Sequence, residues 1–133
     1  MKKPEAKFCA IYQQYLMSDK HNLPAHAWEA KHSRGKDNIP FADIEPHQIA
    51  SLLASNSDKG LCHKISDMSV EQKPYDGFFY RNSPAYMIMA YTGTFYIISI
   101  HNLVHEMSDS KRKSLTKDRA EQICIISVDY KMK

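Results

Sequence analysis

The chain has few cysteines and few glycines, and it contains no long hydrophobic run. Its 133 residues include three cysteines, four glycines and a single tryptophan. Cys9, Cys62 and Cys124 are widely spaced and form no Cys-x-x-Cys pair, which argues against a structural zinc site and indicates reduced cysteines in a cytoplasmic protein. No apolar segment approaches the ~18 residues that a membrane-spanning helix requires. We therefore expect a protein that folds around its own hydrophobic core.

The overall balance of charge and hydrophobicity is that of an ordinary globular protein. Hydrophobic residues make up 43% of the chain and charged residues 25%. The 18 basic and 15 acidic residues leave a formal net charge of +3. This mildly basic balance permits binding to nucleic acid without requiring it. The length predicts one domain over residues 1–133, without internal repeats.

The sequence pattern predicts two helices and a strand in the first half of the chain. A helical stripe over residues 4–18 consists of Phe8, Ile11, Tyr12, Tyr15 and Leu16. Pro24 leads into a predicted strand over 25–33. A second predicted helix spans 46–55, with a proline in its first turn.

The second half of the chain is richer in strand patterns. Residues 85–91 and 94–100 predict a hairpin that turns at Thr92-Gly93. Further strands are predicted over 61–65, 75–80 and 123–130, with a surface helix start followed by a charged loop over 101–112 and a short helix over 114–122. The order of elements predicts an α/β fold in which helices flank a single mixed sheet.

The predicted strand at 25–33 carries an acid and a lysine two residues apart. Side chains two apart on a strand share a face, so Glu29 and Lys31 are expected on one face and Trp28 and Ala30 on the other. An acid and a base held together in this way favour each other's charged form and can contact a cation and a phosphate. The same pattern is also typical of an exposed ion pair on a half-buried strand, and both interpretations stay open.

Three short motifs in this order resemble a known nuclease family. They are Trp28-Glu29-Ala30-Lys31, Ile39-Pro40-Phe41 and Pro46-His47-Gln48-Ile49. Together with the hairpin at 85–100, they resemble the Holliday junction resolvases of Gram-positive bacteria and related phage nucleases, which belong to the PD-(D/E)xK superfamily. The resemblance spans residues 24–104. It implies a restriction-endonuclease-like fold, a DNA substrate and an origin in bacteria or in phage-infected cells.

The chain departs from the family pattern at one metal ligand. The family carries an aspartate on the strand before the acid-x-Lys strand, where this chain has only Asp19 in a polar loop. A Pro-x-Asp sequence occurs downstream instead, as Pro74-Tyr75-Asp76. The resemblance then implies Mg²⁺ or Mn²⁺ held by Asp76, Glu29 and the carbonyl of Ala30, with the two carboxylates on adjacent strands.

The resemblance also implies catalytic roles beside the metal. Lys31 would orient the attacking water or stabilise the charge on the phosphorane, and Gln48 would position a water or a phosphate. Simpler interpretations exist: Asp76 beside Gly77 is typical of a tight turn, and Gln48 is an ordinary polar residue near a helix start.

Basic residues near these motifs are candidate DNA contacts. We expect Arg34, Lys36 and Lys73 to bind phosphates of the backbone. Asp67 is interpreted as a loop cap. Glu5 is interpreted mainly as an acid that stabilises the positive end of a helix dipole, although the superfamily often places an acid of the first helix near the metal.

These observations predict a magnesium-dependent endodeoxyribonuclease that hydrolyses phosphodiester bonds in branched DNA. Symmetric cutting of a four-way junction requires two active sites, so a homodimer is expected. The alternative is a catalytically inactive subunit that keeps the nuclease scaffold and binds DNA or assembles with other proteins. The two differ in one expectation: an enzyme requires Asp76 near Glu29, and a scaffold does not.

Overall fold

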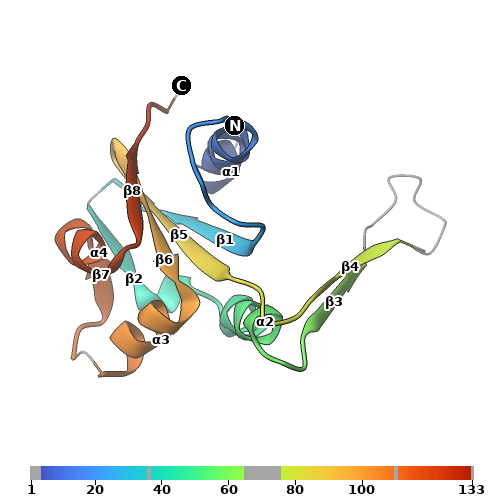
Figure 1. The fold of residues 1–133 in the computed structure, drawn as a ribbon. Coiled ribbons are helices and arrows are strands. Elements are labelled where there is room, and N and C mark those ends of the chain that lie inside the picture. The colour runs from blue at the N-terminus through green and yellow to red at the C-terminus, as the bar shows by residue number, and fades with distance from the viewer. Residues whose placement is uncertain (1–3, 36, 65–75, 110, 133) are drawn as a thin grey trace, which may run out of the picture.

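A four-stranded mixed sheet organises the fold of the computed structural model, which describes residues 4–35, 37–64, 76–109 and 111–132. In chain order the elements are α1 (Pro4–Met17), β1 (Ala27–His32), β2 (Asn38–Pro40), the 3-10 turn η1 (Phe41–Asp43), α2 (Pro46–Asn56), β3 (Leu61–Lys64), β4 (Gly77–Tyr80), β5 (Ala85–Tyr91), β6 (Thr94–Ser99), α3 (Ile100–Asp109), β7 (Ser114–Thr116), α4 (Lys117–Ile123) and β8 (Ile126–Asp129) (Figure 1). This architecture confirms the predicted α/β fold with a mixed sheet flanked by helices.

The sheet has the strand order β1-β5-β6-β8, so β1 and β8 are its edges. Strand β1 pairs in parallel with β5, with Glu29 opposite Met87 and Lys31 opposite Met89. The β5–β6 hairpin and the β6–β8 pair are antiparallel. All seven residues of β5 are buried, as expected for a central strand whose two faces are both covered. The parallel edge strand β1 therefore lies against the most buried strand of the protein.

Helices cover both faces of this sheet (Figure 1). Helix α1 packs on one face, where Phe8 and Tyr12 contact a buried cluster that includes Ile88 and Phe95. Helices α2, α3 and α4 contribute to the core on the opposite face. That second core is centred on Met87, Met89, Tyr91, Ile98, Leu52, Leu103 and Ala120. Strand alternation thus divides the apolar residues of β5 and β6 between two separate cores.

Two predictions in the C-terminal third were right that a helix is present and wrong about its bounds. Residues 100–109 form a complete helix, because Ile100, Leu103 and Glu106 make one buried face against the sheet. The helix predicted over 114–122 is confirmed over most of its length as α4, but residues 114–116 form the short strand β7. Leu115 is fully buried and lies opposite Ile39 in the β2–β7 pair, so tertiary pairing outweighs the local helical pattern.

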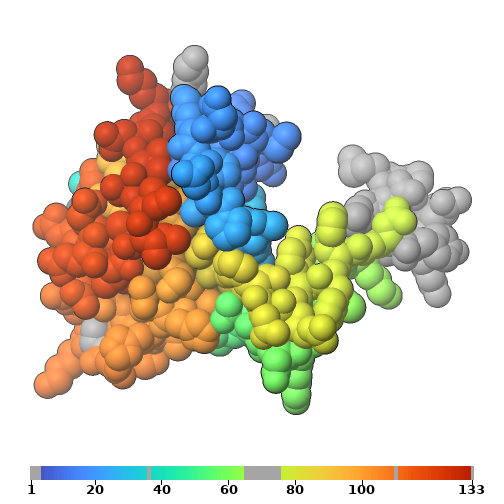
Figure 2. Space-filling view, in the orientation of Figure 1, coloured from blue at the N-terminus to red at the C-terminus, as the bar shows by residue number. Residues whose placement is uncertain are grey.

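Strands β3 and β4 form a separate two-stranded sheet, which we call the arm. The arm stands out from the main body beside α2 (Figures 1 and 2). Gly60 begins it with a positive φ of 84°. A Cβ atom there would lie 2.6 Å from the Tyr80 carbonyl oxygen and 2.7 Å from the Phe79 ring, so only glycine fits this turn.

Across the described ranges, no helix combines the length and the apolar character needed to cross a membrane.

Candidate functional site

Strand β1 presents its acid and its lysine to one face of the sheet, as predicted. On the opposite face, Trp28 packs against Tyr12 of α1 with ring centroids 4.7 Å apart, and Ala30 lies in the same core. Glu29 points to the face that α2 covers, where its carboxylate meets a side chain of that helix. Strand alternation therefore directs the Glu29 side chain towards the start of α2.

Gln48 connects this strand to the start of α2. Its Nε2 donates to Oε2 of Glu29 at 3.3 Å, and its Oε1 accepts from the backbone N–H of Glu45 at 3.3 Å. Gln48 is the third residue of the helix, the position from which a side chain normally satisfies a free N–H at the helix start. The helix cap therefore fixes the orientation in which Gln48 holds Glu29. Sequence reasoning identified the residue but not this double role.

Lys31, two residues after Glu29 on β1, approaches an acid of α1. Its Nζ is 3.8 Å from Oε2 of Glu5 on α1, and its side chain is only 12% exposed. Glu5 therefore does more than stabilise the dipole of its own helix: it supplies a second carboxylate beside the lysine. The signal in the sequence was the acid in the first turn of the first helix, which the resemblance associates with the metal.

The environment of Glu29 opposes its ionisation. Partial burial raises the pKa of this carboxyl above its ordinary value, while Lys31, His47 and the hydrogen bond from Gln48 lower it by a smaller amount. Burial also raises the pKa of the Cys9 thiol on α1, with further contributions from the charges of Glu5 and Glu29. Both carboxylates therefore act on the same small region between α1 and β1.

His32, the next residue on β1, makes hydrogen bonds through both ring nitrogens. Its Nδ1 lies 2.6 Å from the carbonyl oxygen of Ser33, and its Nε2 lies 3.1 Å from the hydroxyl of Tyr130. That hydroxyl donates its only proton to the carbonyl of Tyr91 at 2.6 Å. The two contacts hold the imidazole ring between the end of β1 and the segment that follows β8.

Asp76 does not join this cluster. It is exposed and directly precedes Gly77, which pairs with Lys64 at the outer end of the arm. The inner end of β4 is Tyr80, which lines a cavity of about 400 Å³ together with Glu29. Asp76 lies four residue steps before Tyr80 in extended chain, roughly 13 Å at ~3.3 Å per step. The prediction that Asp76 and Glu29 lie on adjacent strands was wrong, because β4 pairs only with β3.

The carboxylates that are present fit Mg²⁺ by donor type. Mg²⁺ binds hard oxygen ligands and is often held by one or two carboxylates, with waters and phosphate oxygens completing the shell. Glu29 and Glu5 supply two such groups: Glu5 forms an ion pair with Lys31, and the Lys31 charge acts to lower the pKa of Glu29. Among the described residues, no group of three or more His, Cys, Asp or Glu side chains could share one ion. Ala30 lies between Glu29 and Lys31 on β1, and its carbonyl remains a predicted ligand.

The predicted DNA contacts are only partly described. Arg34 is exposed and lines a polar cavity of about 360 Å³ with Lys31 and Glu5. Lys36, Lys73 and Asp67 lie outside the described residues. The structure therefore joins Gln48 to Glu29 in the middle of β1 and brings Glu5 and Arg34 to Lys31 near its end, and we call these five residues the β1 cluster.

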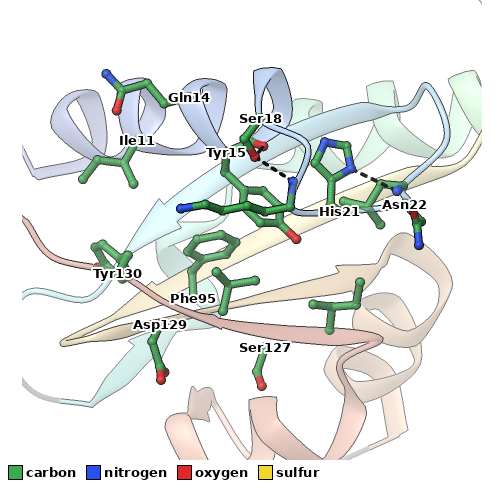
Figure 3. A pocket seen from close by; sticks show the side chains of 14 residues that line it. Ile11, Gln14, Tyr15, Ser18, His21, Asn22, Phe95, Ser127, Asp129 and Tyr130 are labelled. Carbon is green, nitrogen blue, oxygen red and sulfur yellow. Dashed lines mark hydrogen bonds between the residues drawn. The ribbon is translucent and has the colours of Figure 1, made fainter.

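A larger cavity of about 670 Å³ lies on the other side of α1, between that helix and β8 (Figure 3). Its polar side chains largely bond to nearby backbone. Nε2 of His21 donates to the Leu16 carbonyl at 2.8 Å, and its Nδ1 accepts from the N–H of Leu23 at 3.0 Å. The Ser18 hydroxyl donates to the Tyr15 carbonyl at 2.6 Å. These groups hold the loop after α1, so the β1 cluster is the better candidate for chemistry.

No protein-family model matches this sequence, and no curated protein matches it either.

Proposed function

We propose that this chain is a metal-dependent endonuclease that hydrolyses phosphodiester bonds in DNA, with branched DNA of the Holliday junction type as its substrate. The observation that carries the proposal is the β1 cluster. An acid and a lysine share one face of an edge strand, a helix-start glutamine binds the acid, and a second acid approaches the lysine. These are the residue types that phosphodiester hydrolysis requires within one site.

The residues of the cluster divide the chemistry between them. Mg²⁺ or Mn²⁺, held by Glu29 and Glu5 with the Ala30 carbonyl as a further ligand, would supply Lewis-acid polarisation of the phosphate and a more acidic bound water. Lys31 provides a fixed positive charge that stabilises the negative charge accumulating on the phosphate in the transition state. Gln48 holds the Glu29 carboxylate in one orientation. Because the hydrogen bond from Gln48 is already formed, the Glu29 carboxylate need not change its orientation during the reaction.

The arm and the end of β1 supply surfaces suited to DNA. Phe78 and Phe79 are each 54% exposed on the arm, and the guanidinium of Arg81 lies 5.7 Å from the Phe79 ring centroid. Exposed aromatic rings beside cations can stack on bases while the cations contact phosphates. Arg34 places a further cation next to Lys31. Because a junction is cut symmetrically by two related sites, the proposal includes a homodimer.

A second candidate function is supported by the position of Asp76. A domain that retains the scaffold but binds DNA without cutting it would tolerate an aspartate at the outer end of the arm, away from Glu29. Such a subunit would use the arm and the basic end of β1 in the same way. The enzyme proposal gives the role expected of Asp76 to Glu5, which lies beside Lys31, so the two candidates differ in whether the β1 cluster completes a reaction without Asp76.

The test is cleavage of a labelled synthetic four-way junction beside a matched linear duplex. Wild type, Glu29→Gln, Lys31→Gln and Asp76→Asn would be assayed with Mg²⁺, with Mn²⁺ and with EDTA. We expect paired symmetric nicks that require the metal and disappear in the first two variants. Asp76→Asn should cut like wild type, because its carboxylate lies outside the cluster.

The same assay distinguishes the alternatives. Loss of cutting in Asp76→Asn would show that the arm brings this carboxylate to the site in the DNA complex. Intact junction binding by wild type without any cutting would support the scaffold function. Cutting that survives both Glu29→Gln and Lys31→Gln would overturn the proposed site.

A further inference from the structure

A second cavity opens beside the β1 cluster, where β1 ends and β2 begins. Its volume is about 400 Å³. It is lined by His32, Ser33, Arg34, Asn38, Ile39, Pro40 and Asp43. Four of these residues also line the polar cavity that contains Lys31 and Glu5. The two cavities are therefore neighbours with a shared wall. A DNA strand bound at Lys31 would continue into the second cavity.

Two residues that line this cavity each have a buried side-chain oxygen without a hydrogen-bond partner among the described residues. Ser33 is 3% exposed, and its Oγ makes no hydrogen bond to any residue that the structure describes. The same holds for Oδ1 of Asn38. The Ser33 backbone is nevertheless fixed, because its N–H donates to the Ala90 carbonyl at 2.8 Å and extends the β1–β5 ladder. Buried polar groups are almost always paired, so two orphans on one cavity wall indicate a missing ligand or water.

The charged groups of the cavity select the kind of ligand. Arg34 makes no ion pair with the described part of the chain, so its guanidinium is available to an anionic ligand in this cavity. Asp43 and the orphan oxygen of Asn38 supply acceptors on the same wall. A ligand that matches this set carries an anionic group next to a neutral donor. A nucleotide combines a phosphate with hydroxyl and amino groups in this way.

We propose that this cavity binds the nucleotide next to the phosphate held at Lys31. Its phosphate oxygens accept hydrogen bonds from the Ser33 hydroxyl and the Arg34 guanidinium. A hydroxyl or amino group of the same nucleotide donates to Asn38 Oδ1 and the Asp43 carboxylate. The proposal rests on the proposed function, because it assumes that the neighbouring cluster receives a phosphodiester of DNA.

The experiment measures binding of short probes to the full chain in EDTA, where no cleavage is needed. The probes are a 5′-phosphorylated dithymidine dinucleotide, the same dinucleotide without its terminal phosphate, and inorganic phosphate, each titrated and followed by amide NMR shifts. We expect the phosphorylated dinucleotide to bind most tightly and to shift the amides of Ser33 and Asn38. Ser33→Ala and Arg34→Gln should each weaken it about tenfold. Ser127→Ala, which changes an exposed serine of β8, is the matched control.

Two results would overturn the inference. If Ser33→Ala binds the phosphorylated dinucleotide as tightly as wild type but unfolds at lower urea concentration, the orphan groups hold an internal water. If all three probes bind equally, the cavity does not recognise a nucleotide. Binding that depends on Ser33 in a chain that cuts no junction would retain the subsite and refute only the cleavage function.

Discussion

Glu29 and Glu106 are two poorly exposed glutamates in opposite electrostatic situations. Glu106 on α3 is 3% exposed and receives hydrogen bonds from Nε and Nη2 of Arg119 on α4, at 2.9 and 3.0 Å. These bonds lower the pKa of its carboxyl. Glu29 receives one hydrogen bond of 3.3 Å from a neutral amide, and burial raises the pKa of its carboxyl.

The comparison separates a carboxylate that joins two helices from the carboxylate that the proposed function uses. Arg119 matches the carboxylate of Glu106 with a planar two-point contact, so the pair joins α3 to α4 and leaves nothing for a ligand. The charge of Glu29 is only partly compensated, which costs stability and leaves oxygen atoms for a cation. The following predictions test this difference, from the largest effect to the smallest.

The largest effect is expected from the charge of Lys31. Lys31→Gln should reduce the rate of junction cleavage at saturating DNA at least 100-fold, because a fixed charge at the phosphate is lost. Lys31→Arg, which keeps the charge, should retain part of the activity. Lys20→Gln removes an exposed lysine of the loop after α1 and should cut normally. Equal losses in Lys31→Gln and Lys20→Gln would mean that only overall charge matters.

Glu106→Gln should destabilise the fold without touching the β1 cluster. The loss of the charged hydrogen bonds to Arg119 should lower the free energy of unfolding by about 2 kcal/mol at neutral pH. Because the folded-state pKa of Glu106 is lowered, its contribution is fully present above the unfolded pKa of about 4.3 and is lost as pH falls through the lowered value. Urea unfolding of wild type and variant should therefore differ most at pH 7 and converge in acid. A constant difference at every pH would exclude this origin.

Gln48→Glu separates the two roles of this residue. A glutamate at the third helical position can still accept from the Glu45 N–H, so helix stability should change little. It places a like charge beside Glu29, which should raise the pKa of that carboxyl further and move the acid limb of the pH–cleavage profile upward. The measurement is the cleavage rate against pH, with thermal unfolding as the control. An unchanged profile would mean that Glu29 does not ionise in the reaction.

The smallest effect is a gain of stability in Glu29→Gln. A raised folded-state pKa means that the ionised carboxylate destabilises the fold at pH values above it, and that this penalty vanishes in acid below the unfolded pKa. Removing the charge should therefore raise the free energy of unfolding slightly at neutral pH, the opposite sign to Glu106→Gln. A loss of stability in both variants would place Glu29 among the structural carboxylates.

The sequence by itself determined the elements whose pattern is local. The stripe from Phe8 to Leu16 predicts α1, the Thr92-Gly93 turn predicts the β5–β6 hairpin, and alternation over Trp28–Lys31 places Glu29 and Lys31 on one face. These features depend on neighbours within a few residues along the chain. Strand alternation and the position of Gln48 at a helix start were enough to predict three members of the β1 cluster, namely Glu29, Lys31 and Gln48.

Only the tertiary structure decided which distant residues meet. Glu5 approaches Lys31 because α1 packs across β1, and Leu115 becomes a strand residue because Ile39 lies opposite it. Asp76 follows the arm away from the sheet because β4 pairs with β3. Pairing between strands and packing between layers depend on contacts far apart in sequence, and a Pro-x-Asp spacing contains no information about them.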